Sequence, residues 1–315
     1  MTLTAWFRYT EPDMNQLLWV AIAGSALSSA GLAQPKTPFL GRWDINVTTP
    51  QATYPDWMEI TEKDGALEAY IQPRSGGARR TKEVKPDGSR IVITTPQGQI
   101  WDLKIDGDKF TGVQKRGEDT TAQLAGVRAP KLDRPMPARW TDPEPLFNAK
   151  DLSGWEVIPG RPSKWVVKDG ELINEGAGAN LKSTRKFDDF KLHFDVNCPE
   201  NGNSGIYLRG RYEMQIEYVP GEDRFHMMGA IYSHVAPTAD VPRKPGEWET
   251  WDITLVGRRV TIVRSGVKTI DNQEIPGITG GALDANEGEP GAFYIQGDHG
   301  GILKFRNMTI SVPRK

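Results

Sequence analysis

Asp-Gly pairs recur between short stretches of alternating polar and apolar residues, and this pattern limits the fold more than any other feature. The pairs are Asp64-Gly65, Asp87-Gly88, Asp106-Gly107 and Asp169-Gly170. Asp-Gly between alternating stretches is the strongest short-range signal of a β-hairpin, because both residues accept the conformation of a tight primed turn. Convincing amphipathic helices are absent from the sequence, and 33 glycines and 23 prolines suit a turn-rich chain. The sequence therefore predicts an all-β protein.

The predicted strands fall into two groups separated by a proline-rich segment. Residues 38–130 predict a small antiparallel β-meander or partial barrel. Residues 131–145 lack periodicity and are expected to form a linker. Residues 146–313 again contain many short strands between turns, which predicts a sandwich or jelly roll. The first group also carries three tryptophans that could stack on sugars but more often fill a core: Trp43, Trp57 and Trp101.

Residues 1–33 predict an export signal. An apolar run after Met14 leads to small residues, and Gly31 and Ala33 occupy the positions that a signal peptidase reads before a cut at Gln34. Translation could begin at Met14, although Arg8 would then be lost as the positive charge ahead of the run. The run is short for a membrane span and is broken by Gly and Ser. We therefore expect a periplasmic or secreted protein with no transmembrane segment beyond this signal.

Charge and cysteine content exclude several classes of function. The formal net charge of −2 gives no electrostatic basis for binding nucleic acid or an anionic membrane. Cys198 is the only cysteine, so no intrachain disulfide can form and a cysteine-based metal cluster is excluded.

Residues 203–218 predict a hairpin with an unusual polar face. Successive side chains of a strand point to opposite faces. Glu213, Gln215 and Glu217 therefore share one surface, opposite the apolar residues between them. A tight turn at Gly210-Arg211 would place three residues of the first strand on that same surface: Gly205, Tyr207 and Arg209. A row of acids and an amide is typical of the floor of a polar cleft, and the alternative is an ordinary solvated face.

Several motifs of the second group resemble a known family. In chain order they are FNAKDLSGW, KWVVKDGEL, FDDFKLHFDV, NSGIYLR, YEMQI, GAIY, GEWETWDITLVG and QGDHGGILKFRNMTI. Together they resemble the 3-keto-disaccharide hydrolase family, over essentially all of residues 146–313 and none of residues 38–130. The resemblance implies a concanavalin A-like jelly roll with its active cleft on a concave sheet. It also implies an exported bacterial enzyme acting on sugars oxidised at C3.

The chemistry of a 3-keto sugar defines the groups that such an enzyme needs. The hydrogen on C2 is acidified by the neighbouring carbonyl, so a base can remove it and the substituent on C1 can leave by elimination, before water adds back. The base is expected to be Glu213 or Glu217. Arg209 and His299 are the candidates for stabilising the enolate or protonating the leaving group. The resemblance places the QGDHG loop, with His299, near the cleft.

Further residues are candidates for binding the oligosaccharide or glycoside substrate: Gln215, Gln296, Tyr207, Asn203 and Trp248. The identity of any cofactor stays open, and a divalent metal could replace the cationic group. His193 and His299 are the candidate metal ligands, but no HxH or HExxH spacing supports a metal site.

Two other functions remain open. Glu-x-Gln-x-Glu is similar to the Glu-x-Asp-x-Glu strand of concanavalin-like retaining endoglucanases, but residues four apart on a strand lie about 13 Å apart at Cα, whereas retaining carboxyl groups lie about 5–5.5 Å apart. The other alternative is a lectin-like carbohydrate-binding module without turnover.

Overall fold

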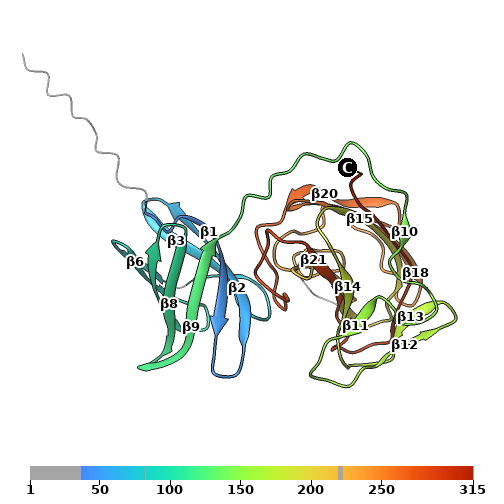
Figure 1. Ribbon diagram of the computed structural model, residues 1–315, viewed down its shortest axis with the longest axis horizontal. Helices are drawn as coiled ribbons and strands as arrows, with labels where there is room; N and C mark the ends of the chain where they lie inside the picture. The colour runs from blue at the N-terminus through green and yellow to red at the C-terminus, as the bar shows by residue number, and fades with distance from the viewer. Residues whose placement is uncertain (1–36, 82, 219–222, 315) are drawn as a thin grey trace, which may run out of the picture. The chain divides into compact units, whose positions relative to one another are not determined.

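The computed structural model describes residues 37–81, 83–218 and 223–314 (Figure 1). The predicted export signal in residues 1–33 lies outside this part of the chain. Regular secondary structure in the described residues consists of strands alone, so the all-β prediction is confirmed. None of the described segments forms an apolar helix of membrane-spanning length.

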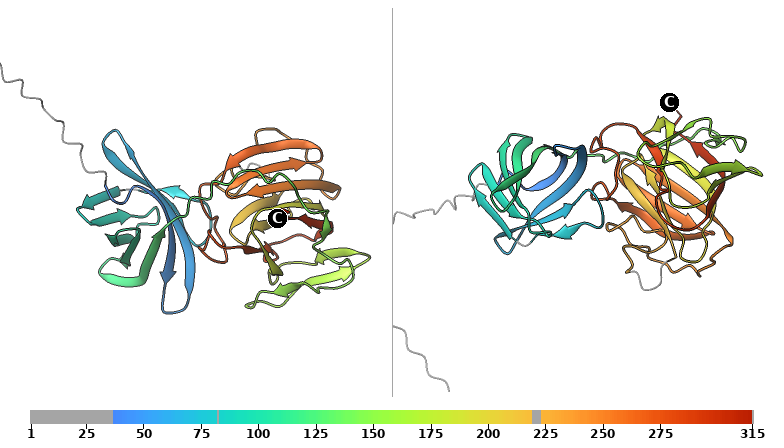
Figure 2. Two further views of the ribbon diagram at one scale, coloured as in Figure 1. Left: turned by 45° about the horizontal axis from the view of Figure 1, so that its top comes forward. Right: turned by 90° about the horizontal axis from the view of Figure 1, so that it is seen from below.

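The first part of the chain forms one antiparallel sheet of nine strands. They are β1 (Gly41–Thr48), β2 (Thr53–Lys63), β3 (Ala66–Gln72), β4 (Arg79–Arg80), β5 (Glu83–Asp87), β6 (Arg90–Thr94), β7 (Ile100–Asp106), β8 (Lys109–Arg116) and β9 (Asp119–Arg128). Their order is β4-β3-β2-β1-β9-β8-β7-β6-β5. β3 also contacts β5, so the two ends of the sheet curl toward each other (Figure 2). The predicted meander or partial barrel is confirmed.

The hairpins of this sheet follow the Asp-Gly pairs. Asp64 and Gly65 connect β2 to β3, and both have positive φ angles, 51° and 78°. The connections from β5 to β6 and from β7 to β8 begin one residue later, at Gly88 and Gly107. Each of these glycines also has a positive φ, which glycine adopts without a steric penalty.

The predicted role of the three tryptophans as core residues is confirmed. Trp43 and Trp101 are buried in the core of the nine-stranded sheet. Trp57 is also fully buried, but it belongs to the core of the second part of the chain, where it packs against Gly277 and His234. A sugar-stacking platform is excluded because none of the three rings is exposed.

The second part of the chain is a sandwich of two antiparallel sheets. The larger sheet contains β10 (Glu144–Pro145), β12 (Trp165–Lys168), β13 (Glu171–Asn174), β15 (Phe190–Asn197), β18 (Trp248–Val256), β19 (Arg259–Arg264), β20 (Val267–Glu274) and β22 (Leu303–Ser311). The smaller sheet contains β11 (Trp155–Val157), β14 (Leu181–Phe187), β16 (Asn203–Leu208), β17 (Tyr212–Glu217) and β21 (Gly291–Ile295), in the order β11-β14-β21-β16-β17. One apolar core joins them, as the contact of Phe190 with Phe293 illustrates at 4.7 Å between ring centroids.

The β16–β17 hairpin has the predicted alternation. Tyr207 lies opposite Glu213, and Asn203 lies opposite Glu217. Ile206 and Met214, on the other face, are buried in the apolar core. The polar face of this hairpin therefore points away from the sandwich core.

The outer edge of β17 is covered by the segment that follows it. The predicted strand around GAIY forms turns and isolated bridges instead, but its backbone still pairs with β17. Gly229 N–H donates to the Gln215 carbonyl at 2.8 Å, and Tyr232 N–H donates to the Glu213 carbonyl at 3.0 Å. This segment thus covers the edge of β17, and its Tyr232 lines the cavity over the polar face.

Candidate active site

A polar cavity of about 410 Å³ lies over this face of the small sheet. Its size falls within the range of small-molecule sites, which is roughly 300–1,000 Å³. The lining comes from β16, β17, β21 and the loops around them: Ser75, Gly76, Asn203, Tyr207, Glu213, Gln215, Glu217, Tyr232, Gly280, Gly281, Tyr294, Gln296, Asp298 and His299. The predicted row of acid and amide groups is therefore the floor of a cavity and not a solvated face.

Glu213 has the environment of a proton-transfer group. Its side chain is only 5% exposed, and burial raises the pKa of its carboxyl to about 8. A hydrogen bond with Tyr207 and the charge of His299 oppose this rise in pKa only in part. Its side chain lies across Gly205, where a Cβ would come within 2.5 Å of the carboxyl oxygen. A carboxyl group with a pKa near neutrality can take up and release a proton during one reaction cycle.

Tyr207 connects Glu213 to the wall of the cavity. Its hydroxyl donates to the Gly280 carbonyl at 2.8 Å and also contacts the Glu213 carboxyl. Its ring stacks on Tyr294 with 4.3 Å between centroids. Asn180 in turn donates to the Tyr294 hydroxyl at 2.7 Å, so both rings are held in place. Burial raises the pKa of Tyr207, which keeps its hydroxyl protonated as a donor.

Two glutamine side chains offer acceptors to a ligand. The Gln215 amide nitrogen donates to Glu217, whose other carboxyl oxygen accepts from Asn203 at 2.9 Å. The carbonyl oxygens of Gln215 and Gln296 are buried and have no hydrogen-bond partner within the described structure. Such acceptors are costly unless a ligand or water satisfies them, and sugar hydroxyls are suitable donors.

His299 lies in the same cavity and is paired with Asp298. The His299 Nδ1 atom is 2.9 Å from an Asp298 carboxyl oxygen. This interaction raises the pKa of His299 and lowers that of Asp298, while partial burial opposes both shifts. The charges of Glu213 and Glu217 raise the pKa of His299 further. The raised pKa keeps His299 cationic over a wider pH range than an ordinary imidazole, and the cation can donate a proton.

Comparison with protein families identifies the second part of the chain. Residues 142–311, more than half of the chain, match the model of the 3-keto-alpha-glucoside-1,2-lyase-like domain. The protein belongs to this family. The resemblance to 3-keto-disaccharide hydrolases in the sequence is thereby confirmed, and residues 38–130 lie outside the matched region.

Individual proteins and solved structures are similar to parts of this chain. A 3-keto-disaccharide hydrolase of Bacteroides thetaiotaomicron is 31% identical over 74 residues, which cover 20% of this chain and 25% of that protein. A provisionally named glycosyl hydrolase of Parabacteroides distasonis is 29% identical, with a TM-score of 0.47 over 56% of this chain and 92% of its own. A second one from the same organism is 22% identical, with a TM-score of 0.45 over 54% and 92%.

Arg209 does not lie in the cavity, and the prediction that it faces the same way as Glu213 is wrong. The turn begins at Arg209 itself, whose positive φ of 54° takes it out of the alternation of β16. Its guanidinium is buried on the opposite side, where it donates to the Gly257 carbonyl at 2.5 Å and to Asp188 at 3.2 Å. Arg209 thus anchors the turn and cannot reach a ligand in the cavity.

Trp248 and His193 lie on the larger sheet, away from the cavity lining. The Arg306 guanidinium stacks over the Trp248 ring at 4.0 Å, so this ring is not a sugar platform of the cavity. His193 is half-buried and pairs with Asp252 at 2.8 Å. The described residues contain no group of three His, Cys, Asp or Glu side chains placed to hold a metal ion.

The sequence interpretation missed several residues of the cavity. Tyr294 and Asp298 continue the alternation that places Gln296 on the cavity face, so the stretch AFYIQGD contained this signal. Ser75 and Gly76 come from the nine-stranded sheet, and no local pattern indicates that they contact residues 200 positions later in the chain.

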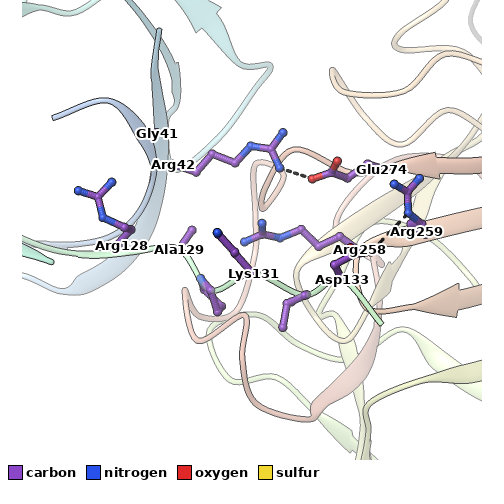
Figure 3. A pocket seen from close by; sticks show the side chains of 11 residues that line it. Gly41, Arg42, Arg128, Ala129, Lys131, Asp133, Arg258, Arg259 and Glu274 are labelled. Carbon is purple, nitrogen blue, oxygen red and sulfur yellow. Dashed lines mark hydrogen bonds and ion pairs between the residues drawn. The ribbon is translucent and has the colours of Figure 1, made fainter. Parts of the chain in front are cut away.

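A second pocket, lined by arginines, has different chemistry. It is formed by Gly41, Arg42, Arg128, Ala129, Pro130, Lys131, Leu132, Asp133, Arg258, Arg259 and Glu274. Figure 3 shows Arg42 paired with Glu274 across it. Arg128 pairs with Asp108, and Arg258 pairs with Glu287 at 2.5 Å. These arginine side chains are already paired with carboxylates, so they stabilise the fold. The pocket therefore presents fewer unpaired polar groups to a ligand than the cavity over β17 does.

Proposed function

We propose that this protein cleaves the glycosidic bond of 3-keto-glycosides by elimination across C1 and C2, followed by hydration. The observation that carries the proposal is the buried Glu213 carboxyl, whose pKa of about 8 suits proton transfer at a weakly acidic C–H bond. Membership of the 3-keto-alpha-glucoside-1,2-lyase-like family and the name of the Bacteroides relative support the same substrate class.

In the first step the Glu213 carboxylate removes the proton from C2 of the oxidised ring. The C–H electron pair forms the C2=C3 bond of an enolate, and the carbonyl oxygen on C3 becomes negative. When Glu213 is protonated, Tyr207 can donate to Gly280 and accept from the carboxyl; when Glu213 is ionised, the Tyr207 hydroxyl can donate to it instead. Tyr207 thereby holds the carboxyl in both states.

In the second step the enolate collapses and the leaving group departs. The C3 carbonyl re-forms, the electron pair moves between C1 and C2, and the bond from C1 to the glycosidic oxygen breaks. The cationic His299 stabilises the negative charge and gives a proton to the departing oxygen. Water then adds its oxygen to C1 and a proton to C2, which yields the free 3-keto sugar. Glu213 releases its proton to solvent and His299 takes one up, so both groups return to their starting states.

The substrate is held by groups that stay fixed during these steps. The free acceptor oxygens of Gln215 and Gln296 bind ring hydroxyls, and Asn203 orients Glu217 at the same end of the cavity. Acceptors that are satisfied only by a ligand favour polyhydroxylated molecules over apolar ones.

The proposal is tested with purified protein, 3-keto-trehalose, a 3-keto-glucoside and the unoxidised parent sugars, each with and without EDTA. We expect cleavage of the keto forms alone, because only they have an acidified C2 hydrogen. Cleavage of unoxidised glucans would instead support a retaining glycosidase, and binding without turnover would support a lectin-like module. Loss of activity with EDTA would reveal a metal requirement.

Export belongs to the same proposal and is supported by the apolar run after Met14. Expression in a Gram-negative host followed by N-terminal sequencing tests it. We expect periplasmic protein that begins at Gln34, whereas uncleaved protein in the cytoplasm would contradict export.

A further inference from the structure

The loop between β3 and β4 brings a piece of the nine-stranded sheet into the wall of the candidate active site. Ser75 and Gly76, at its tip, line the cavity together with residues of β16 and β17. Ser75 is exposed on the cavity side, whereas Gly77, which follows the tip, is buried. No role follows for this loop from the family match, which begins at residue 142.

Hydrogen bonds hold the loop in a defined shape. The Gln72 amide nitrogen donates to the carbonyls of Pro73 and Gly76 at 2.7 and 2.8 Å, which closes the loop on itself. The Gly281 N–H donates to the Arg74 carbonyl at 2.8 Å and ties the loop to the far wall of the cavity. Gln72 is itself buried, so these bonds are shielded from competition with water.

Glycines permit the close approach of the loop to the sandwich. A Cβ on Gly280 would lie 2.5 Å from the Gly76 carbonyl oxygen, and a Cβ on Gly77 would lie 2.2 Å from the Ser233 hydroxyl. The loop is therefore packed backbone against backbone at Gly280, and a side chain there would displace it.

The loop meets the cavity at the end where Glu213 lies. Gly280 accepts from the Tyr207 hydroxyl, and a Cβ on Gly281 would lie 2.6 Å from the same hydroxyl oxygen. The opposite end is formed by the Asn203–Glu217 pair and lies beside the Gln296–His299 segment. The cavity thus has a loop-covered end near the base and another end near the proton donor.

We infer that the loop Pro73–Ala78 closes the sugar pocket and restricts the substrate to glycosides whose oxidised ring is terminal. The inference rests on the proposed function. The inference places C2 toward Glu213 and the C1 substituent toward His299, which leaves the C4 side of the ring toward the loop. Of the loop residues, Ser75 and Gly76 line the cavity. A second sugar attached on the C4 side would overlap Ser75 and Gly76.

The first test compares two substrates on the wild-type protein: a 3-keto-disaccharide with an unsubstituted oxidised ring, and a trisaccharide that carries a further sugar on O4 of that ring. We expect kcat/KM for the trisaccharide to be lower by about 100-fold or more, because overlap with a fixed wall prevents productive alignment. Equal values would overturn the inference.

The second test places a large side chain on the loop so that it occupies part of the pocket. Ser75→Trp is expected to raise KM for the disaccharide about tenfold with a smaller change in kcat. Ser89→Trp places the same side chain in an exposed turn of the same sheet and should leave both constants unchanged. An unchanged KM for Ser75→Trp would contradict the inference that the loop closes the pocket.

If neither substrate is turned over, the proposed function fails. The inference that the loop closes the pocket is then tested by measuring ligand binding. Calorimetry with 3-keto-glucose as the probe compares Ser75→Trp with Ser89→Trp. Weaker binding by Ser75→Trp alone supports the closed end, whereas equal or absent binding by wild type and both variants overturns it.

Discussion

Glu213 combines a functional advantage with a cost to stability. Its carboxyl is buried in the cavity without a cation in direct contact among the described residues, so its protonated form is favoured up to a pH of about 8. In the proposed mechanism this burial suits the group to proton transfer, and it also makes the ionised side chain unfavourable in the folded state. Activity and stability should therefore respond to this residue in opposite directions.

Replacement of Glu213 by Gln tests the catalytic role. We expect kcat/KM for a 3-keto-disaccharide to fall by about 10²–10⁴-fold, which is the usual contribution of a general base. In the wild type kcat/KM should rise with pH up to about 8 as the Glu213 carboxyl ionises. The raised pKa of His299 means that this side chain loses its proton at a higher pH than an ordinary imidazole. A Glu213→Gln variant with wild-type kinetics would remove Glu213 from the mechanism.

The same variant is expected to be more stable than the wild type at alkaline pH. The pKa of Glu213 rises from 4.5 in the unfolded chain to about 8 in the fold, so the folded state binds more protons between these values and wild-type stability falls as pH rises through this window. The Tm of Glu213→Gln minus that of wild type should grow from pH 5 to pH 8. Glu62→Gln, at an exposed position, should show no such trend. A difference that is constant with pH would contradict the raised pKa.

At the scale of elements, the alternation of β16 and β17 could be predicted from the sequence, because side-chain direction in a strand depends only on local geometry. It correctly placed Glu213, Gln215 and Glu217 on one face. It misplaced Arg209, because the left-handed φ at that residue depends on where the turn begins, and the dipeptide Gly210-Arg211 indicated a later start.

Other parts of the site could not be predicted from local patterns. The Ser75–Gly76 tip reaches the cavity through contacts between distant segments, and its approach depends on Gly280 and Gly281. Neither the burial of Trp57 in the second core nor the pairing of β1 with β9 follows from any short stretch of sequence. Alternation of polar and apolar residues predicts which side chains share a face of a strand, whereas tertiary packing decides which faces contact each other.

Gly205→Ala tests the local geometry of β16. An added Cβ would lie 2.5 Å from a Glu213 carboxyl oxygen, so the carboxyl must move. A displacement near 1 Å at a catalytic group can cost on the order of 100-fold in rate, and we expect kcat/KM to fall accordingly. Gly288→Ala serves as the control, since its Cβ would make only an ordinary contact of 3.7 Å with Pro130. Equal activity of both variants would show that Glu213 does not depend on the space above Gly205.

At the scale of the whole molecule, buried side chains link the nine-stranded sheet to the sandwich. Trp57 extends from β2 into the second core, and Asp44 on β1 shares a hydrogen bond with Glu287. Burial and the neighbouring Glu287 raise the pKa of Asp44 to about 10, so this carboxyl stays protonated as a donor at neutral pH. These contacts explain how a loop of the nine-stranded sheet comes to line the candidate active site of the sandwich.

Trp57→Ala tests this coupling. Removing a buried tryptophan typically costs about 3–5 kcal/mol of unfolding free energy. Because Trp57 packs on Gly277, close to the Gly280–Gly281 wall, we also expect a higher KM at temperatures where the variant is folded. Trp101→Ala, within the core of the nine-stranded sheet, should lower the Tm without raising KM. Equal effects of Trp57→Ala and Trp101→Ala on KM would show that Trp57 has no specific influence on the pocket.

Elimination across C1 and C2 is tested most directly by the hydrogen on C2 of the released sugar. The reaction is run in D₂O with a 3-keto-disaccharide, and the product is examined by NMR at early times, beside unreacted substrate and an enzyme-free control. Elimination and hydration predict deuterium at C2 of the released 3-keto sugar. Release of product that keeps its original C2 hydrogen would show direct hydrolysis at C1 and contradict the role of Glu213 as the base that removes it.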